Sequence, residues 1–287
     1  MRLHDALDQF VLQLQADGRS EHTIGNYRRH VALLARWLGT NDDLDDVTPQ
    51  TLARFLTSDM ARLDANGVAR SASTVNAIRT SLRVVFGWLH DAGLVRTNAA
   101  RLVRRAICSP PPPKTLSDDE IDRLLATIAN DPTPEGKRDH ALFSLMAWTG
   151  IRLSSAIGID VEDVDLARAE ILLRRVKRDR TERVLLGPRT VDLLATYLCG
   201  RRSGPAFSAF HGGVLGRRQA ARRLELWLER ARLPHRGAHA LRHSFATALY
   251  QRTGDVLLVK EALGHRSVVS TLVYARPDAG RLRRAMA

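Results

Sequence analysis

Several short motifs in the second half of the sequence carry side chains that could act together on a phosphate group. They read TGIRLS, a lysine in a polar loop between two β-rich runs, HALRH, LGH, and a tyrosine near the end of the chain. Arginine can bond two phosphate oxygens at once, histidine exchanges protons near neutral pH, and an activated tyrosine hydroxyl is a nucleophile. The residues that these motifs offer are Arg152, Lys177, His239, Arg242, His265 and Tyr274.

Taken one at a time, these residues have ordinary structural explanations. An arginine after a glycine turn usually caps a helix, and a lysine at a hairpin tip usually keeps the loop solvated. A histidine beside an arginine on an amphipathic helix usually lies at the surface, and a late tyrosine usually packs with its hydroxyl in water. The occurrence of all the motifs in one order along one chain favours a shared function instead.

This ordered set resembles the tyrosine recombinase (phage integrase) family, of the Xer and Cre type. The resemblance covers essentially the whole chain. It implies a mainly α-helical fold with a small β-hairpin or sheet. The N-terminal part is expected to be a four-helix, SAM-like DNA-binding bundle, and the C-terminal part an α+β tyrosine recombinase catalytic domain.

The resemblance also implies a role for each site residue. Arg152 and Arg242 correspond to the two catalytic arginines, which hold the nonbridging oxygens of the phosphodiester. Tyr274 corresponds to the nucleophile, which forms a 3′-phosphotyrosyl link to the cut strand. His239, of the HxLR box, is the expected partner for proton exchange with the phenol, and His265, of the LGH element, is expected to hydrogen-bond the phosphate.

The lysine of the family's β-hairpin corresponds to Lys177, which is expected to protonate the departing 5′ oxygen. The loop lengths of this hairpin vary in the family, so Arg178 or Arg180 could occupy the same place. The implied reaction needs no metal, no ATP and no other cofactor. One departure is Ser155, which stands where the family commonly has an acidic residue that orients the catalytic arginines.

The charge of the chain agrees with an anionic partner. The 287 residues include 44 lysines and arginines against 31 aspartates and glutamates, a net charge of +13. Such a chain is expected to bind a polyanion, and nucleic acid is favoured over a membrane because no apolar run reaches the length of a membrane span. The two cysteines, Cys108 and Cys199, have neither metal-ligand nor disulfide spacing, which favours the cytoplasm.

Proline marks the expected domain boundary. The run CSPPPPK cannot continue a helix and favours an extended spacer. We therefore expect a core DNA-binding domain over residues 1–106, a proline-rich linker over 107–116 and a catalytic domain over 117–287. Helix starts are expected at Thr48, with a helix to about Leu63, at Ser73, and at Ser117, where Ser-Asp-Asp-Glu forms a capping box. A hairpin is expected from the β-rich runs 170–176 and 182–186.

Several arginines outside the catalytic motifs fall on polar helix faces and could contact DNA phosphates. An ordinary solvated surface is the alternative for each of them. The resemblance places the second and fourth N-terminal helices against the major groove. The expected DNA-contacting residues are Arg28, Arg29, Arg79, Arg83, Arg222 and Arg223.

The sequence therefore predicts a site-specific DNA recombinase, for integration, excision or resolution of DNA. Its expected partners are double-stranded DNA with a specific recombination site, three further copies of the chain in a tetramer on that DNA, and accessory proteins in some settings. The first helix is expected within a few residues of Met1, which leaves no room for an additional arm-binding domain. Two alternatives stay open: a type IB topoisomerase that relaxes DNA, and a non-cleaving DNA-binding protein of the same fold.

Overall fold

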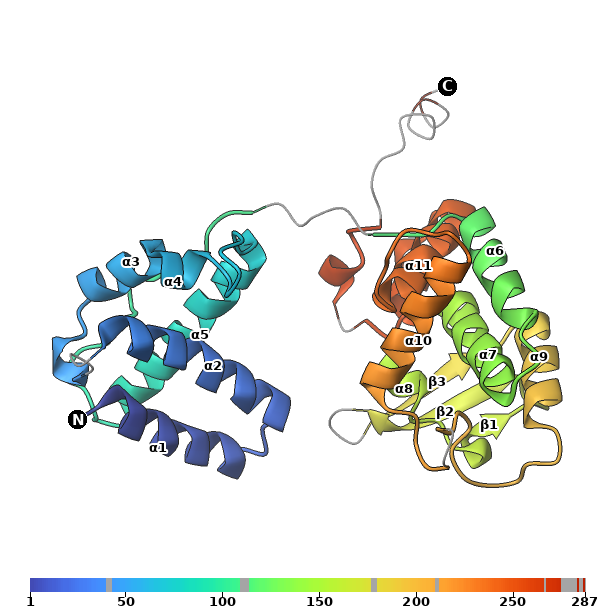
Figure 1. Cartoon of the computed structure of the whole chain (residues 1–287), viewed down its shortest axis with the longest axis horizontal. Helices are drawn as coiled ribbons and strands as arrows, with labels where there is room; N and C mark the ends of the chain where they lie inside the picture. The colour runs from blue at the N-terminus through green and yellow to red at the C-terminus, as the bar shows by residue number, and fades with distance from the viewer. Residues whose placement is uncertain are drawn as a thin grey trace. The chain divides into compact units, whose positions relative to one another are not determined.

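The computed structural model describes residues 1–39, 43–108, 114–176, 180–209, 212–265 and 267–274, together with Arg283 and Met286. The side chains of residues 174–176, 180 and 181 lie outside this description. The chain divides into two compact units, Met1–Pro110 and Pro111–Ala287 (Figure 1). Each unit is built around its own apolar core.

The N-terminal unit is a small helical bundle, as the sequence predicts. Its helices pack with their apolar stripes inward, and Phe10, Leu34, Phe55 and Phe86 are among the fully buried side chains. The helices are α1 (Leu3–Ala16), α2 (Glu21–Leu38), α3 (Pro49–Thr57), α4 (Asp59–Arg62) and α5 (Ala72–Asp91).

Two details of this bundle differ from the expectation. The helix that begins after Thr48 does not continue to Leu63, because Ser58 has an extended backbone and separates α3 from α4. The Ser58 hydroxyl donates to the Phe55 carbonyl at 2.7 Å, a local bond that competes with the helix. The N-cap of α5 is Ser71 and not Ser73, since the Ser71 hydroxyl accepts the Thr74 N–H.

The residue that precedes the expected linker and the last residue of that linker are each held by the adjacent unit. In the N-terminal unit, the Asn76 side chain bonds both the N–H and the carbonyl of Ala106, at 2.8 and 3.0 Å. In the C-terminal unit, the buried Ser244 hydroxyl bonds the N–H and the carbonyl of Leu116, at 2.7 and 2.8 Å. Residues 109–113, which carry the proline run, lie outside the described residues.

The C-terminal unit is α+β. The capping box at Ser117 and Glu120 forms as expected, and α7 is the central helix, in contact with α6, α9, α10 and α11 (Figure 1). Across the described residues, no helix combines the length and apolarity needed to cross a membrane. The helices are α6 (Asp118–Ala129), α7 (Pro134–Thr149), α8 (Leu153–Ala156), α9 (Pro188–Leu198), α10 (Arg217–Arg230), α11 (His239–Thr253) and α12 (Val256–Ala262).

The expected hairpin is present and belongs to a small antiparallel sheet of order β1-β2-β3 in the described part of the chain. Its strands are β1 (Val164–Asp165), β2 (Glu170–Val176) and β3 (Arg180–Leu185). Ile171 and Leu173 of β2 are buried in the core, two residues apart on one face of the strand. The short strand β1 has no clear sequence signal, because two residues are too few to show an alternating pattern.

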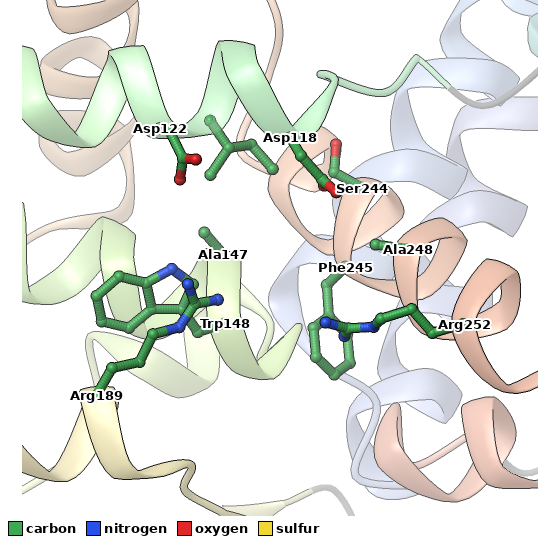
Figure 2. Close-up of a pocket in the computed structure, with 10 residues that line it drawn as sticks. Asp118, Asp122, Ala147, Trp148, Arg189, Ser244, Phe245, Ala248 and Arg252 are labelled. Carbon is green, nitrogen blue, oxygen red and sulfur yellow. The ribbon is translucent and has the colours of Figure 1, made fainter.

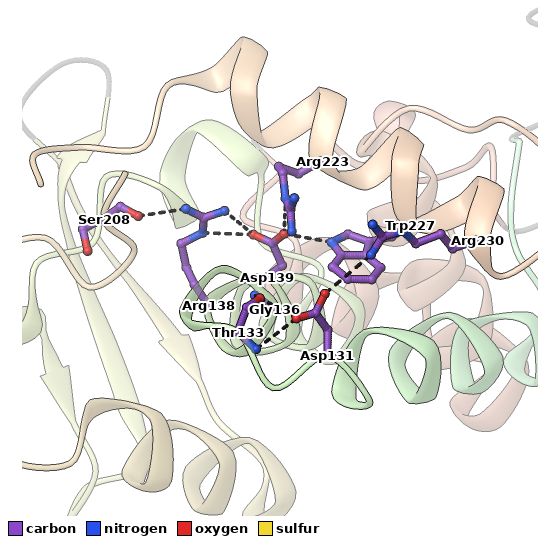
Figure 3. A network of polar contacts seen from close by, with 9 residues as sticks. All are labelled: Asp131, Thr133, Gly136, Arg138, Asp139, Ser208, Arg223, Trp227 and Arg230. Atoms are coloured by element: carbon purple, nitrogen blue, oxygen red, sulfur yellow. Dashed lines mark hydrogen bonds and ion pairs between the residues drawn. The ribbon is translucent and has the colours of Figure 1, made fainter. Parts of the chain in front are cut away.

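A buried ionic network ties α7 to α10 (Figure 3). The Asp139 carboxylate is fully buried and accepts hydrogen bonds from Arg138 at 2.6 and 2.9 Å, from Arg223 at 2.5 Å and from the Trp227 indole at 2.8 Å. Arg138 also donates to the Ser208 carbonyl at 3.1 Å. Because a charge this deeply buried is stable only when its bonds are satisfied, the network fixes α10 on the core.

Candidate active site

The TGIR motif forms a tight turn between two helices. α7 ends at Gly150, which has a left-handed backbone with φ of 68°, and Arg152 then caps α8. A Cβ atom at position 150 would also overlap the side chains of Phe245 and Leu263. Glycine is therefore required here both for the backbone conformation and for the close approach of α11 and α12.

Arg242 is the most firmly held cation of the site. It lies on α11 with 5% of its surface exposed. Its Nη1 donates to the Gly150 carbonyl at 2.7 Å and its Nη2 to the Leu263 carbonyl at 2.6 Å. Both carbonyls belong to C-cap residues, where the helix dipole is negative. Burial, and then the charge of Arg152, lower the pKa of Arg242 to about 10.

This anchoring bears on the serine at position 155. Ser155 lies in α8, the short helix that Arg152 caps. The family resemblance assigns the orientation of the arginines to an acid at this position. Here the Arg242 guanidinium is oriented by two main-chain carbonyls, so its placement does not depend on a carboxylate at position 155.

The LGH motif is the C-terminal turn of α12. Gly264 has φ of 59°, its N–H bonds the Glu261 carbonyl, and the His265 N–H bonds the Lys260 carbonyl, which is the Schellman pattern. The carboxylate of Glu182, on β3, lies directly against Gly264, where a Cβ would overlap it. The charge of Glu182 raises the pKa of Arg242, which opposes the effect of burial. Strand β3 therefore passes beside the site.

His265 projects from this turn toward the arginines. Its Nδ1 lies 2.9 Å from the hydroxyl of Thr271, which is fully buried. Burial lowers the pKa of His265 to about 4, and the charges of Arg242, Arg152 and His243 act in the same direction. A neutral ring that accepts the Thr271 proton at Nδ1 carries its own proton on Nε2, which is then a donor for a phosphate oxygen.

The depressed pKa of His265 predicts a pH-dependent stability. Between about pH 6.5 and pH 4 the unfolded chain binds a proton at this residue and the folded chain does not, so the free energy of unfolding should fall as the pH falls through this window. His265→Asn, which keeps a group able to bond Thr271, should give a shallower fall. Urea denaturation at a series of pH values measures both slopes, and equal slopes would contradict the assignment.

Tyr274 is buried beside the same arginines. Only 7% of it is exposed, and its ring packs with Ala246, Val259 and Leu263. Burial raises the pKa of the phenol, while the charges of Arg242 and Arg152 lower it. Its hydroxyl therefore lies within the electrostatic field of both guanidinium groups, and its role as the nucleophile stays a prediction.

The hydrogen-bond partner of the Tyr274 hydroxyl is His243, whose Nδ1 lies 2.6 Å away. The sequence favoured His239 as the proton-exchange partner. His239 is the first residue of α11, and its ring centroid lies 5.9 Å from that of His243. Burial and the charges of Arg242, Arg152 and Arg217 lower the pKa of His239. Its role in proton exchange stays a prediction.

The structure thus brings together most of the residues expected in the site and adds others. Lys177 and its alternative Arg178 lie outside the described residues, as does the side chain of Arg180. A sequence signal for His243 existed, because it follows His239 by one helical turn and so shares its face. Glu182 and Thr271 carry no such signal, because both lie near predicted site residues in the sequence but outside the motifs.

The expected DNA-contacting arginines differ in their surroundings. Those with exposed side chains are free to meet a phosphate, and contact with DNA stays a prediction for each. The exposed ones are Arg28 and Arg29 on α2, Arg83 on α5 and Arg222 on α10.

Two of these arginines make contacts within the protein. Arg79 is half-buried and donates to the Asn76 side chain at 3.1 Å, next to the segment that Asn76 holds. Arg223 donates its Nε to the buried Asp139. Both arginines therefore help to hold the fold, and of the Arg222–Arg223 pair, Arg222 is the exposed member.

A separate pocket of about 190 Å³ lies beside α11 (Figure 2). Ser244, Ala248 and Arg252 line it at four-residue spacing, away from the face that carries Arg242 and His243. On its far wall, Arg189 stacks on the Trp148 ring at 4.3 Å. In the part of the chain that the structure describes, no group of three or more histidine, cysteine, aspartate or glutamate residues is arranged to hold a metal ion.

Both units of the chain match known protein families. Residues 114–281 match the phage integrase family, and residues 7–98 match the phage integrase N-terminal SAM-like domain. The tyrosine recombinase XerC of Neisseria meningitidis serogroup C is 31% identical over 280 residues, covering 94% of this chain and 90% of the relative. The tyrosine recombinase XerD of Mycobacterium tuberculosis is 31% identical over 291 residues, covering 96% and 92%.

Solved structures share the fold. The XerH recombinase bound to its difH substrate, before cleavage, superposes with a TM-score of 0.74 at 24% identity, covering 98% of this chain and 83% of that one. A lambda integrase fragment bound to a COC′ core site superposes with a TM-score of 0.77 at 21% identity, covering 98% and 97%. The chain belongs to the phage integrase family, the tyrosine recombinases.

Proposed function

We propose that this protein is a site-specific DNA recombinase that cuts and rejoins strands through a 3′-phosphotyrosyl intermediate. The observation that carries the proposal is the burial of Tyr274 within the electrostatic field of Arg152 and Arg242. All three residues belong to the same chain. Two guanidinium groups offset the charge that builds on the nonbridging oxygens when a nucleophile attacks phosphorus. This environment suits a phenol that attacks a phosphodiester.

Each of these side chains then acts at one step of strand cleavage. The Tyr274 oxygen attacks phosphorus, the bond to the 5′ oxygen breaks, and the protein stays joined to the 3′ end of the strand. His265 donates a hydrogen bond from its Nε2–H to a phosphate oxygen, a role that its bond to Thr271 supports. Because the new ester keeps the bond energy of the cut strand, a 5′-hydroxyl of a second duplex can reverse the step without ATP. The positive charge that this step needs is supplied by arginine, so we propose no metal in it.

We propose Lys177 as the acid that protonates the leaving 5′ oxygen. Its position in the sequence falls between the end of β2 and the start of β3, and β3 passes beside the turn after α12, where Glu182 lies against Gly264. A lysine can give up its proton at this step, whereas an arginine holds its proton too strongly. Lys177→Arg should therefore slow cleavage of ordinary DNA but not of DNA whose leaving oxygen is replaced by sulfur, which needs no proton to depart.

The proposed partner is double-stranded DNA, with four copies of the chain joining two sites. The net charge of +13 supports a polyanionic partner. Among the similar structures, XerH is bound to difH substrate and lambda integrase is a dimer bound to a core site. The tetramer is a proposal from the strand-exchange chemistry, because two duplexes cut at both strands require four nucleophiles.

A capture experiment tests the proposal and identifies the target sequence at the same time. The protein is incubated with sheared genomic DNA from the organism that encodes it, and the mixture is denatured with detergent. The DNA fragments that stay linked to the protein are then isolated and sequenced. We expect linked fragments that share one sequence, with the 3′ end blocked and the 5′-hydroxyl free. Fragments linked at the 5′ end, or no linked DNA, would contradict the proposal. Relaxation of a plasmid that lacks the recovered sequence would indicate a type IB topoisomerase instead.

The anchoring of Arg242 predicts the effect of a conservative replacement. A lysine at this position has one ammonium group and cannot donate from two separate nitrogens to the carbonyls of Gly150 and Leu263 while facing a phosphate. We expect Arg242→Lys to slow adduct formation about 10²- to 10³-fold, measured in a single turnover on nicked DNA. Arg252→Lys, at an exposed position ten residues further along the same helix, is the matched control and should keep the native rate.

A further inference from the structure

His243 holds the nucleophilic hydroxyl directly. Its Nδ1 lies 2.6 Å from the Tyr274 oxygen, and the two rings are tilted with centroids 5.6 Å apart. The contact is therefore a hydrogen bond and not a stacking of the rings. Because Tyr274 is only 7% exposed, water competes little for this hydroxyl.

The surroundings of His243 favour the neutral form of its ring. Burial lowers its pKa, and the charges of His239 and Arg242, on the same helix, lower it further. His265 faces it from the turn after α12, and Tyr274 faces it from the C-terminal segment. A neutral imidazole with its proton on Nε2 offers the Nδ1 lone pair as an acceptor, and the phenol donates to it.

We propose that His243 accepts the proton of the Tyr274 hydroxyl during strand cleavage; this rests on the proposed function. As the phenolic oxygen bonds phosphorus, its proton moves to Nδ1, the bond from phosphorus to the 5′ oxygen breaks, and that oxygen leaves with a proton from the acid proposed at Lys177. On rejoining, a 5′-hydroxyl attacks phosphorus and gives its proton to the neutral amine at Lys177, the bond from phosphorus to Tyr274 breaks, and His243 returns its proton to the phenol. No electron is gained or lost in either direction.

His239 is placed for a different task. It lies one turn before His243, and the charges that lower its pKa come from Arg242, Arg152 and Arg217, with no contribution from Tyr274. Among the described residues, it makes no hydrogen bond to the phenol. Its position among the guanidinium groups suits a contact with the phosphate that they hold. In this assignment His239 contacts the phosphate and His243 takes the proton of the phenol.

Single-turnover adduct formation on nicked DNA, measured from pH 6 to pH 9.5, tests the assignment. We expect His243→Ala and His243→Asn to react about 10²- to 10³-fold more slowly than the native chain at pH 7. The asparagine can still bond the phenol but cannot take its proton. The deficit should shrink by about tenfold for each pH unit toward the phenol pKa, since a phenolate needs no base, and imidazole in solution should partly restore His243→Ala.

His239→Asn is the matched control, and its deficit should not change with pH or imidazole. A His243 deficit that is constant across the pH range and unaffected by imidazole would overturn the proposal, because it would indicate a structural role. A pH-dependent deficit at His239 would overturn it as well, because it would assign the proton to the other histidine.

A second readout needs no DNA and separates the two proposals. In nitrogen-15-labelled protein, the Nδ1 resonance of His243 should report an accepted hydrogen bond in the native chain and should move in Tyr274→Phe. An unchanged resonance would overturn the pairing. If the native chain forms adducts but the His243 variants do not show the expected dependence on pH and imidazole, only the proton-transfer role of His243 is contradicted. If the pairing is seen but no DNA is ever linked, the proposed function falls and takes the proton-transfer role with it.

Discussion

The Tyr274→Phe variant is expected to bind duplex DNA as the native chain does and to form no covalent adduct with it. Phenylalanine keeps the ring among Ala246, Val259 and Leu263 and removes only the oxygen that would attack phosphorus. The lost hydrogen bond to His243 should cost about 1 kcal/mol of stability, too little to unfold the C-terminal unit. Denaturing electrophoresis of labelled nicked DNA measures the adduct, and a mobility-shift assay measures binding.

The matched control is Tyr250→Phe. Tyr250 lies on α11 and packs against the same apolar cluster as Tyr274, so its replacement tests whether loss of any tyrosine hydroxyl in this region abolishes the reaction. We expect this variant to form adducts. An adduct in Tyr274→Phe, or its loss in Tyr250→Phe, would show that the nucleophile has been assigned to the wrong residue.

Asp139→Ala is expected to lower the free energy of unfolding of the C-terminal unit by about 3–5 kcal/mol. The replacement leaves the Arg138 side chain, 5% exposed, without the carboxylate that balances its charge, and it leaves Arg223 and the Trp227 indole without their acceptor (Figure 3). Urea denaturation followed by circular dichroism, resolved into the transitions of the two units, measures the change.

Two further variants test whether the loss of stability comes from the burial of the Asp139 charge or from the loss of any carboxylate. Asp165→Ala removes a carboxylate from an exposed pair with Arg168 at 3.9 Å, and this should cost about 0–1 kcal/mol. Replacing Arg138 by methionine together with Asp139 by leucine removes both buried charges, and it should destabilise less than Asp139→Ala alone. Equal losses for Asp139→Ala and Asp165→Ala would contradict a structural role for the network.

Features that depend on neighbouring residues were predictable from the sequence. The capping box at Ser117, the glycine that ends α7 and the antiparallel hairpin all follow from local rules of capping, backbone freedom and side-chain alternation. The ordered motifs identified the family for the same reason, because a residue type at a fixed local spacing is visible in one sequence. The N-terminal bundle was expected from the resemblance to this family.

Local rules were less exact where two of them competed. Ser58 lies inside a stretch with helical periodicity, yet its hydroxyl bonds a main-chain carbonyl and the helix is interrupted there. Ser71 and Ser73 both precede the same helix, and only the geometry decides which one caps it. In both cases the sequence predicted the element but not its boundary.

What the sequence determined by itself was the family and the local turns that carry the expected site residues. Tertiary structure alone decided their partners: His243 rather than His239 for Tyr274, the carbonyls of Gly150 and Leu263 for Arg242, and the buried Asp139 for Arg223. Each partner lies at least 21 positions away along the chain. Such contacts are set by how helices pack against one another, and the spacing of residues along one chain does not contain that information.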